Sequence, residues 1–285
     1  MKKAVRVVMA AAGLGILLAG CAKKEPAPET TGTPAETAEE TTAEETEEVS
    51  KDIFARLSEA PEDAETQIAV LAREVSTWAP DTEEYAGFWT GCAAADLDHN
   101  GRLEIIVSAA GGTGMFTTTR IWEVNEQKDG ISEVKWEKEE GDSEPDALGS
   151  IRQTAYIDED SELIYYIAPD YTRNGAAENY ETLYALSLND GEITVQDLAG
   201  RHETADASGN VTAEFWDSEG SSISEEEYEA AADAVFGNLE KAEFSLIWLD
   251  SENLGTEDGI ASLPEEKLVS KLQASFDGFG FEKAQ

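Results

Sequence analysis

From Phe88 onward, short runs of β-branched and aromatic residues alternate with tight-turn signals, and this rhythm limits the folds open to the chain. Asp190-Gly191 stands between two alternating runs, as a two-residue hairpin turn requires. Consecutive strands joined by such turns predict an antiparallel meander, with hairpins like those of propeller blades. The predicted strands are 104–110, 117–124, 134–138, 154–158, 163–169, 181–188, 192–199, 212–216 and 243–250.

Helices are predicted before and after the strands. Between Pro61 and Pro80 apolar residues recur at helical spacing on one face, and a shorter helix is expected around Ile53. Towards the C-terminus, Ser224 and Glu227 have the spacing of a capping box ahead of a second helix. Residues 262–276 are predicted to form a further helix, which is amphipathic. The predicted fold class is α+β: an N-terminal helix, a β-meander and C-terminal helices.

The first residues read as an export signal. Three basic residues precede an apolar stretch, 7–18, that is too short to span a membrane. The stretch ends in Leu18-Ala19-Gly20-Cys21, which resembles the lipobox of bacterial lipoproteins. The resemblance implies that Cys21 is diacylated, that signal peptidase II removes residues 1–20, and that the mature chain is anchored to the cell membrane on its extracytoplasmic side. An ordinary secretory signal is the alternative.

Residues 22–50 hold nine Glu, seven Thr and three Pro, with no aromatic residue. This composition buries too little apolar surface to offset the entropy of ordering, which predicts a disordered stalk. The threonines are possible O-glycan acceptors. The predicted organisation is therefore a signal peptide at 1–20, a lipidated Cys21 with an acidic linker at 21–50, and a single α+β domain at 51–285.

The net charge of the chain limits the kinds of partner that are expected. With 61 acidic and 20 basic residues, the formal net charge is −41. Removing residues 1–20, which carry three basic and no acidic residues, would bring it to −44. Such a field repels nucleic acid and anionic lipid, so neither is expected as a partner. It concentrates cations instead, which favours occupancy of a weak calcium site, although acidity also serves solubility or a saline habitat.

The stretch ADLDHNGRLEIIVS, residues 95–108, resembles a metal loop. Gly101 permits a sharp turn, and the backbone carbonyl of Arg102 would add a ligand to four side chains at alternating positions: Asp96, Asp98, Asn100 and Glu104. Calcium prefers about six to eight oxygen ligands, so these residues predict a structural Ca²⁺ site. Leu97 is expected to turn into the core and His99 outward. A plain Asx-rich turn without metal is the alternative.

The loop departs from an EF-hand in two ways. Val107 stands where the bidentate glutamate belongs, and the strand-like EIIVS follows where a helix should begin. The stretch resembles instead the calcium loops of FG-GAP and VCBS-type repeats, in which D-x-D-x-[DN]-G-x-x-[DE] joins two strands. Together with ISEEEYEAA it also resembles segments of uncharacterised surface lipoproteins from Gram-positive gut bacteria. This resemblance implies an extracellular, calcium-stabilised β module and assigns no catalytic residue.

Other chemistry is less well supported. Cys92 lies among apolar residues and is expected to be a buried hydrophobe. The glycine-rich stretch 109–119 lacks the Lys of a P-loop and reads as a hairpin loop. With two histidines, His99 and His202, a Ser-His-Asp triad is not indicated. Five tryptophans are open to a sugar-stacking or a core role: Trp89, Trp122, Trp136, Trp216 and Trp248.

Two functional hypotheses follow. The first is a non-enzymatic surface lipoprotein whose calcium-stabilised domain binds an extracellular protein or glycan. The second is an extracellular hydrolase of glycan or wall polymer that uses paired carboxylates as acid and base. A cleft with two carboxylates about 5–10 Å apart, beside an exposed tryptophan, would favour the hydrolase.

Overall fold

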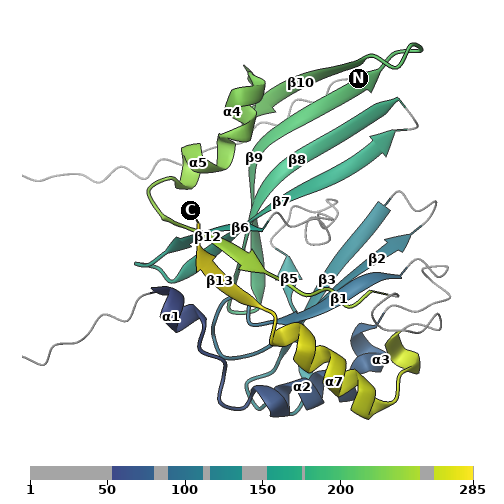
Figure 1. Ribbon diagram of the computed structural model, residues 1–285, viewed down its shortest axis with the longest axis vertical. Helices are drawn as coiled ribbons and strands as arrows, with labels where there is room; N and C mark the ends of the chain where they lie inside the picture. The colour runs from purple at the N-terminus through teal and green to yellow at the C-terminus, as the bar shows by residue number, and fades with distance from the viewer. Residues whose placement is uncertain are drawn as a thin grey trace, which may run out of the picture. The chain divides into compact units, whose positions relative to one another are not determined.

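The computed structural model describes residues 53–79, 89–111, 116–136, 153–174, 177–250 and 260–284, all within the unit Val49–Gln285. The predicted signal peptide, Cys21 and the linker lie outside the described residues. In the described part the fold is α+β, as predicted, with two largely antiparallel sheets and few helices (Figure 1).

Sheet 1 is a four-stranded antiparallel meander in the order β1-β2-β3-β4, the up-and-down order of a single propeller blade. Its register aligns Ala95 of the first strand with Glu104, and Glu104 with Glu123 of the third. The two glutamates therefore lie side by side on one face of the sheet. The strands are β1 (Trp89–Ala95), β2 (Glu104–Gly111), β3 (Phe116–Val124) and β4 (Ile131–Glu133).

Sheet 2 has the order β11-β10-β9-β8-β7-β6-β12-β13, and β5 pairs in parallel with β9. The predicted hairpin is confirmed, because Asn189 pairs with Glu192 across Asp190-Gly191. The strands are β5 (Lys135–Trp136), β6 (Thr154–Asp158), β7 (Leu163–Asn174), β8 (Glu178–Asn189), β9 (Glu192–Ala205), β10 (Val211–Asp217), β11 (Ser222–Ile223), β12 (Glu240–Ser245) and β13 (Gly280–Lys283).

The predicted helices form, although two of them are interrupted. The helix expected between Pro61 and Pro80 breaks at Glu74, and the capped helix breaks at Ala230. Ser224 and Glu227 make the predicted capping box in full. The helical elements are α1 (Ile53–Leu57), α2 (Ala64–Arg73), α3 (Val75–Trp78), α4 (Glu225–Glu229), α5 (Ala231–Phe236), η2 (Ile260–Ser262) and α7 (Glu265–Phe276).

The strand predicted at 243–250 is wrong in its second half. β12 begins earlier, at Glu240, and ends at Ser245, after which the chain crosses to sheet 1. There Leu249 and Cys92 exchange two backbone hydrogen bonds, of 3.1 and 2.7 Å. This segment is apolar because it bridges two sheets, which a local strand pattern does not reveal.

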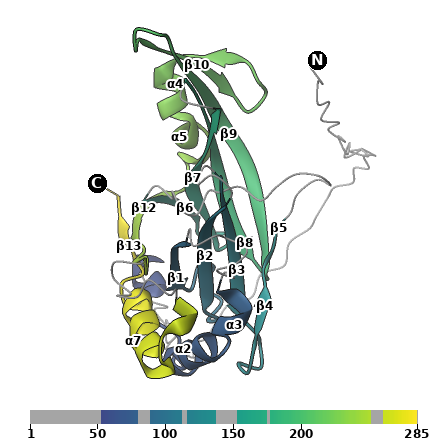
Figure 2. The same cartoon turned by 90° about the vertical axis from the view of Figure 1, so that its right-hand side faces the viewer.

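Three apolar cores hold the layers together, and Figures 1 and 2 show α2 and α7 side by side against sheet 1. One core lies between α2, α7 and the outer face of sheet 1, with Ile68 and Leu272 fully buried. A second fills the space between the inner faces of the two sheets, around Ile106 and Tyr166. The third packs α4 and α5 against the other side of sheet 2 through Tyr228 and Phe236. The order of layers is helix, sheet, sheet, helix.

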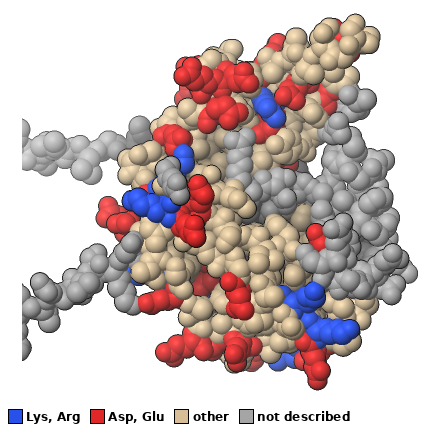
Figure 3. Space-filling view, viewed as in Figure 1, with Lys and Arg blue, Asp and Glu red and all other residues tan. Residues whose placement is uncertain are grey.

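Acidic side chains face solvent over much of the domain. Three consecutive glutamates of α4, Glu225 to Glu227, are exposed, and Figure 3 shows a group of red side chains over this helix. Small groups of Lys and Arg interrupt the acidic surface in the same view. Most acids in this domain are therefore hydrated, which makes the few that are buried informative.

Candidate metal centre

The predicted loop connects β1 to β2 and folds as a series of Asx turns. The Asn100 backbone N–H donates to Asp98 at 3.3 Å, and the Arg102 N–H donates to the Asn100 side-chain oxygen at 2.7 Å. Gly101 has φ +81°, a left-handed conformation that glycine adopts without penalty. His99 has φ +53°, so packing holds a non-glycine residue in the same region.

Gln67 of α2 fixes the loop from the helix side. Its side-chain amide donates to the Gly101 carbonyl at 2.8 Å and accepts from the Leu103 N–H at 2.9 Å. Gln67 is fully buried, so both backbone groups depend on it for their hydrogen bonds. One helix residue thus determines where the loop lies on sheet 1.

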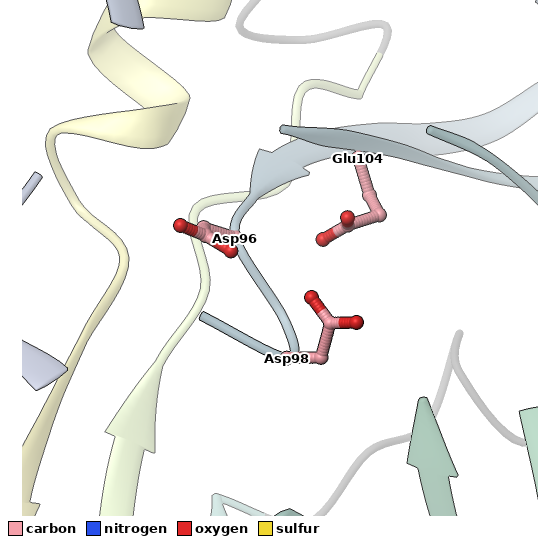
Figure 4. Close-up of side chains that lie close together, drawn as sticks. All are labelled: Asp96, Asp98 and Glu104. Atoms are coloured by element: carbon pink, nitrogen blue, oxygen red, sulfur yellow. The ribbon is translucent and has the colours of Figure 1, made fainter. Parts of the chain in front are cut away.

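Three carboxylates converge inside this loop. Each of Asp96, Asp98 and Glu104 offers one oxygen, and the three oxygens lie within 4.8 Å of one another (Figure 4). Glu104 has 0% and Asp96 4% of its surface exposed, whereas Asp98 is half-buried. Two residues come from the loop and one from the first position of β2, so the β1–β2 hairpin alone assembles the cluster.

The polar atoms of the cluster are only partly satisfied within the described residues. The Leu97 N–H donates to Glu104 Oε2 at 2.6 Å, and the Tyr166 hydroxyl donates to the Leu97 carbonyl at 2.7 Å. Glu104 Oε1 and Asp96 Oδ1 are buried and have no hydrogen-bond partner. A buried carboxylate oxygen without a partner is costly when it is ionised, and a bound cation would compensate these two atoms.

The spacing of the oxygens meets one requirement for a shared calcium ion. Two oxygens that each lie about 2.4 Å from one ion can be no more than about 4.8 Å apart. The cluster meets this limit. Carboxylate oxygens are also the hard ligands that calcium prefers. Water would supply the remaining ligands, since three side chains do not complete a calcium shell.

Burial raises the pKa values of all three carboxyls. Desolvation, followed by the charge of Asp98, raises the pKa of Asp96 to about 7. Desolvation, followed by the charge of Glu123, raises the pKa of Asp98 to about 6. The pKa of Glu104 lies well above its usual value for the same leading reason. The folded chain therefore resists ionising this cluster in the absence of a cation.

Asn100 and Arg102, also predicted as ligands, differ from the other three. The Asn100 side-chain oxygen accepts from the Arg102 N–H, and its amide nitrogen donates to Asp98 at 3.0 Å and to Glu123 at 2.7 Å. The Arg102 side chain pairs with Glu123 at 3.0 Å. In this arrangement the Asn100 side chain lies against Asp98 and braces the cluster of Asp96, Asp98 and Glu104.

Glu123 also lies beside the cluster, and it was not predicted from the sequence. It is 5% exposed, and its charge contributes to the raised pKa values of Asp96, Asp98 and Glu104. The signal was available in the hairpin register, since pairing EIIV with RIWEV places Glu104 opposite Glu123. Held by Asn100 and Arg102, Glu123 is a second layer of negative charge around the centre.

Leu97 and His99 flank the predicted ligands, and the prediction for Leu97 is confirmed whereas the prediction for His99 is wrong. Leu97 is buried in the core between the sheets, as predicted. His99 does not point outward: its ring packs against Phe279 and Phe281 at centroid distances of 5.9 and 5.5 Å. The residues after Glu104 form β2 and not a helix, which agrees with the exclusion of an EF-hand.

The remaining candidates have structural positions. Cys92 is a free, fully buried thiol, and burial raises its pKa far above the usual value, as expected of a core residue. Gly111 pairs with Phe116, so the glycine-rich stretch joins two paired strands, although residues 112–115 lie outside the described part. Trp122 is buried in a core, and the Trp89 side chain lies outside what the structure describes.

Comparisons with protein families, with curated proteins and with solved structures find no match to this chain. The resemblance of the loop to FG-GAP and VCBS-type repeats therefore stays a prediction.

We predict that Gln67→Ala destabilises the fold by about 1–3 kcal/mol, because it removes the hydrogen bond to the Gly101 carbonyl and leaves the buried Leu103 N–H without this partner. Urea unfolding measures the change. The matched control is Thr66→Ala, at the adjacent exposed position of α2, which should change stability by less than about 0.5 kcal/mol. Equal effects of the two substitutions would contradict this role for Gln67.

We predict that metal-free protein loses stability as pH rises from about 5 to about 7.5. Asp96 and Asp98 have folded-state pKa values of about 7 and about 6, above the ordinary 3.8. Over this range the unfolded chain has released protons that the folded chain still holds, so a higher pH favours unfolding. Thermal melts with a chelator measure the fall, which Asp98→Asn should reduce. A melting temperature that rises with pH in wild type would contradict the prediction.

Proposed function

We propose that this chain is a lipid-anchored, extracytoplasmic binding protein whose β-rich domain is stabilised by one calcium ion at Asp96, Asp98 and Glu104. The observation that carries the proposal is the convergence of three buried or half-buried carboxylates, two of which have an unpartnered oxygen. Burying several ionised carboxylates together is unfavourable unless a cation compensates them. A divalent ion supplies that compensation at one point.

The location of the site suits a structural ion. Asp96 and Asp98 belong to the connection between two strands, and Glu104 begins the second strand. An ion bound to all three would fix the β1–β2 hairpin. Glu104 accepts a hydrogen bond from the Leu97 N–H, and the Leu97 carbonyl accepts one from the Tyr166 hydroxyl, so the ion would also be linked to sheet 2. Calcium would then stabilise the packing of the two sheets as well as the loop.

The membrane anchor rests on the sequence. The lipobox ending at Cys21 supports lipidation, and the acidic segment after it suits a stalk that holds the domain away from the membrane. In the part of the chain that the structure describes, no helix has the length and apolarity needed to cross a membrane.

The carboxylate spacing favours a bound ion over glycoside hydrolysis. A hydrolase places two carboxyls about 5–10 Å apart around an accessible bond. In this cluster the oxygens lie within 4.8 Å, and Glu104 has no exposed surface. Binding of an extracellular protein or glycan is therefore the activity we propose, with carboxylate-dependent hydrolysis as the alternative.

We predict that calcium raises the thermal stability of the wild-type chain and that Asp98→Ala abolishes this effect. At a free concentration about 100 times its Kd, calcium should stabilise the folded state by about 2.7 kcal/mol. Thermal melts with calcium and with chelator measure the difference. Asp160→Ala, which removes an exposed acid from the β6–β7 turn, is the matched control and should keep the full response. Identical wild-type melting temperatures in calcium and in chelator would refute the calcium site.

We predict that the wild-type chain, expressed in a bacterium, incorporates labelled palmitate and that Cys21→Ser does not. Serine cannot form the thioether that carries the lipid, and signal peptidase II acts after acylation. Mass spectrometry should find residues 1–20 retained in the variant. Cys92→Ser is the control, since Cys92 is buried in the domain and should not affect labelling. Equal labelling of the Cys21 variant and wild type would exclude the proposed anchor.

A further inference from the structure

A cavity of about 220 Å³ adjoins the metal centre, between the α1–α2 connection and the end of α7. Asp96 forms part of its wall, together with His99, Asp277 and Phe279. A second cavity, of about 180 Å³, has Asp98 and the same His99 in its wall. Two carboxylates of the cluster thus each line a cavity, and His99 stands beside both.

His99 is held in place at this junction. Its backbone has φ +53°, and its ring stacks on Phe279 with an interplanar angle of 24°. Its Nε2 atom is buried and has no hydrogen-bond partner within the described residues. A left-handed non-glycine residue persists only where surrounding contacts fix it, so the wall between the cavities is preorganised.

We propose that the larger cavity binds one neutral, hydroxyl-rich ring, such as the terminal sugar of a glycan. This inference rests on the proposed function, because it identifies the partner class of the calcium-stabilised domain. A pocket that holds a drug-sized ligand has a volume of about 300–1,000 Å³, so 220 Å³ suits a single ring and not an oligomer.

The charge of the wall selects against anions. Three carboxylates around a divalent cation leave a net charge of −1, and Glu59 and Asp277 add further negative charge to the cavity. Sugar hydroxyls, by contrast, are donors that carboxylates accept. Asp277 accepts one hydrogen bond, from Gln273 at 2.8 Å, and an ionised carboxylate has capacity for several.

The apolar part of the wall complements the ring itself. Phe276, Phe279 and Leu57 line the cavity together with its polar groups. The C–H face of a sugar packs against such aromatic surface, while the hydroxyls at its edge reach Asp96 and Asp277. Half of the residues that line the cavity are apolar and half are polar or charged, so the wall offers both kinds of contact to one ring.

The test uses the full chain loaded with calcium, whose binding is measured first by calorimetry. Three neutral probes, the methyl glycosides of mannose, galactose and N-acetylglucosamine, are then titrated and followed by saturation-transfer NMR, with glucuronate as the anionic comparison. We expect saturable binding of at least one neutral glycoside and none of glucuronate. Phe279→Ala and Asp277→Asn should each weaken sugar binding about tenfold, as loss of one stacking or charge-assisted contact does, with calcium affinity retained.

Asp277→Asn keeps the shape of the side chain, so it tests the sugar site even if Phe279→Ala fails to fold. Asp160→Asn, on an exposed turn, is the matched control for Asp277→Asn. Calcium binding without saturable binding of any of the three glycosides would overturn the sugar site and leave the proposed function intact. Sugar binding that both cavity substitutions leave unchanged would also overturn it. Failure of calcium to bind would overturn both proposals.

Discussion

The burial of Asp96, Asp98 and Glu104 against one another is the constraint on which the centre of this structure depends. Each carboxylate is removed from water. The charge of Asp98 raises the cost of ionising Asp96, and the charges of Asp98 and Asp96 raise the cost of ionising Glu104. Protonation relieves that cost at low pH, and we propose that a bound divalent cation relieves it at neutral pH. The binding energy of such an ion would then become folding energy.

The same loop is where the layers of the domain meet. Gln67 reaches it from α2, Tyr166 from sheet 2, and Phe279 from the segment before β13. The Leu97 peptide joins the two sheets directly, because its N–H is bound by Glu104 and its carbonyl by Tyr166. The proposed ion would therefore contact one hairpin and stabilise the packing of several elements. A cavity lined in part by Asp96 and His99 adjoins the same loop.

Local signals in the sequence predicted most elements, and non-local contacts account for what they missed. Asp190-Gly191 and the Ser224 capping box are short-range signals, and both features form as predicted. β1 is alanine-rich and becomes a strand through its pairing with β2, while β13 pairs with β12, which precedes it by some forty residues. Asp96, Asp98 and Glu104 could be predicted because they lie close together in one loop. Gln67 could not, since helix packing brings it there, whereas Glu123 could have been found from the pairing of β2 with β3.

Equilibrium dialysis against radioactive calcium measures whether the cluster binds one calcium ion. The chain, first stripped of metal by a chelator, is dialysed at near-neutral pH alongside Glu104→Gln, which keeps the side-chain shape but removes one buried charge. The account predicts saturable binding of one calcium per chain by wild type and a Kd weakened about tenfold or more in the variant. It is contradicted by the absence of saturable binding to wild type, or by equal affinity in both proteins.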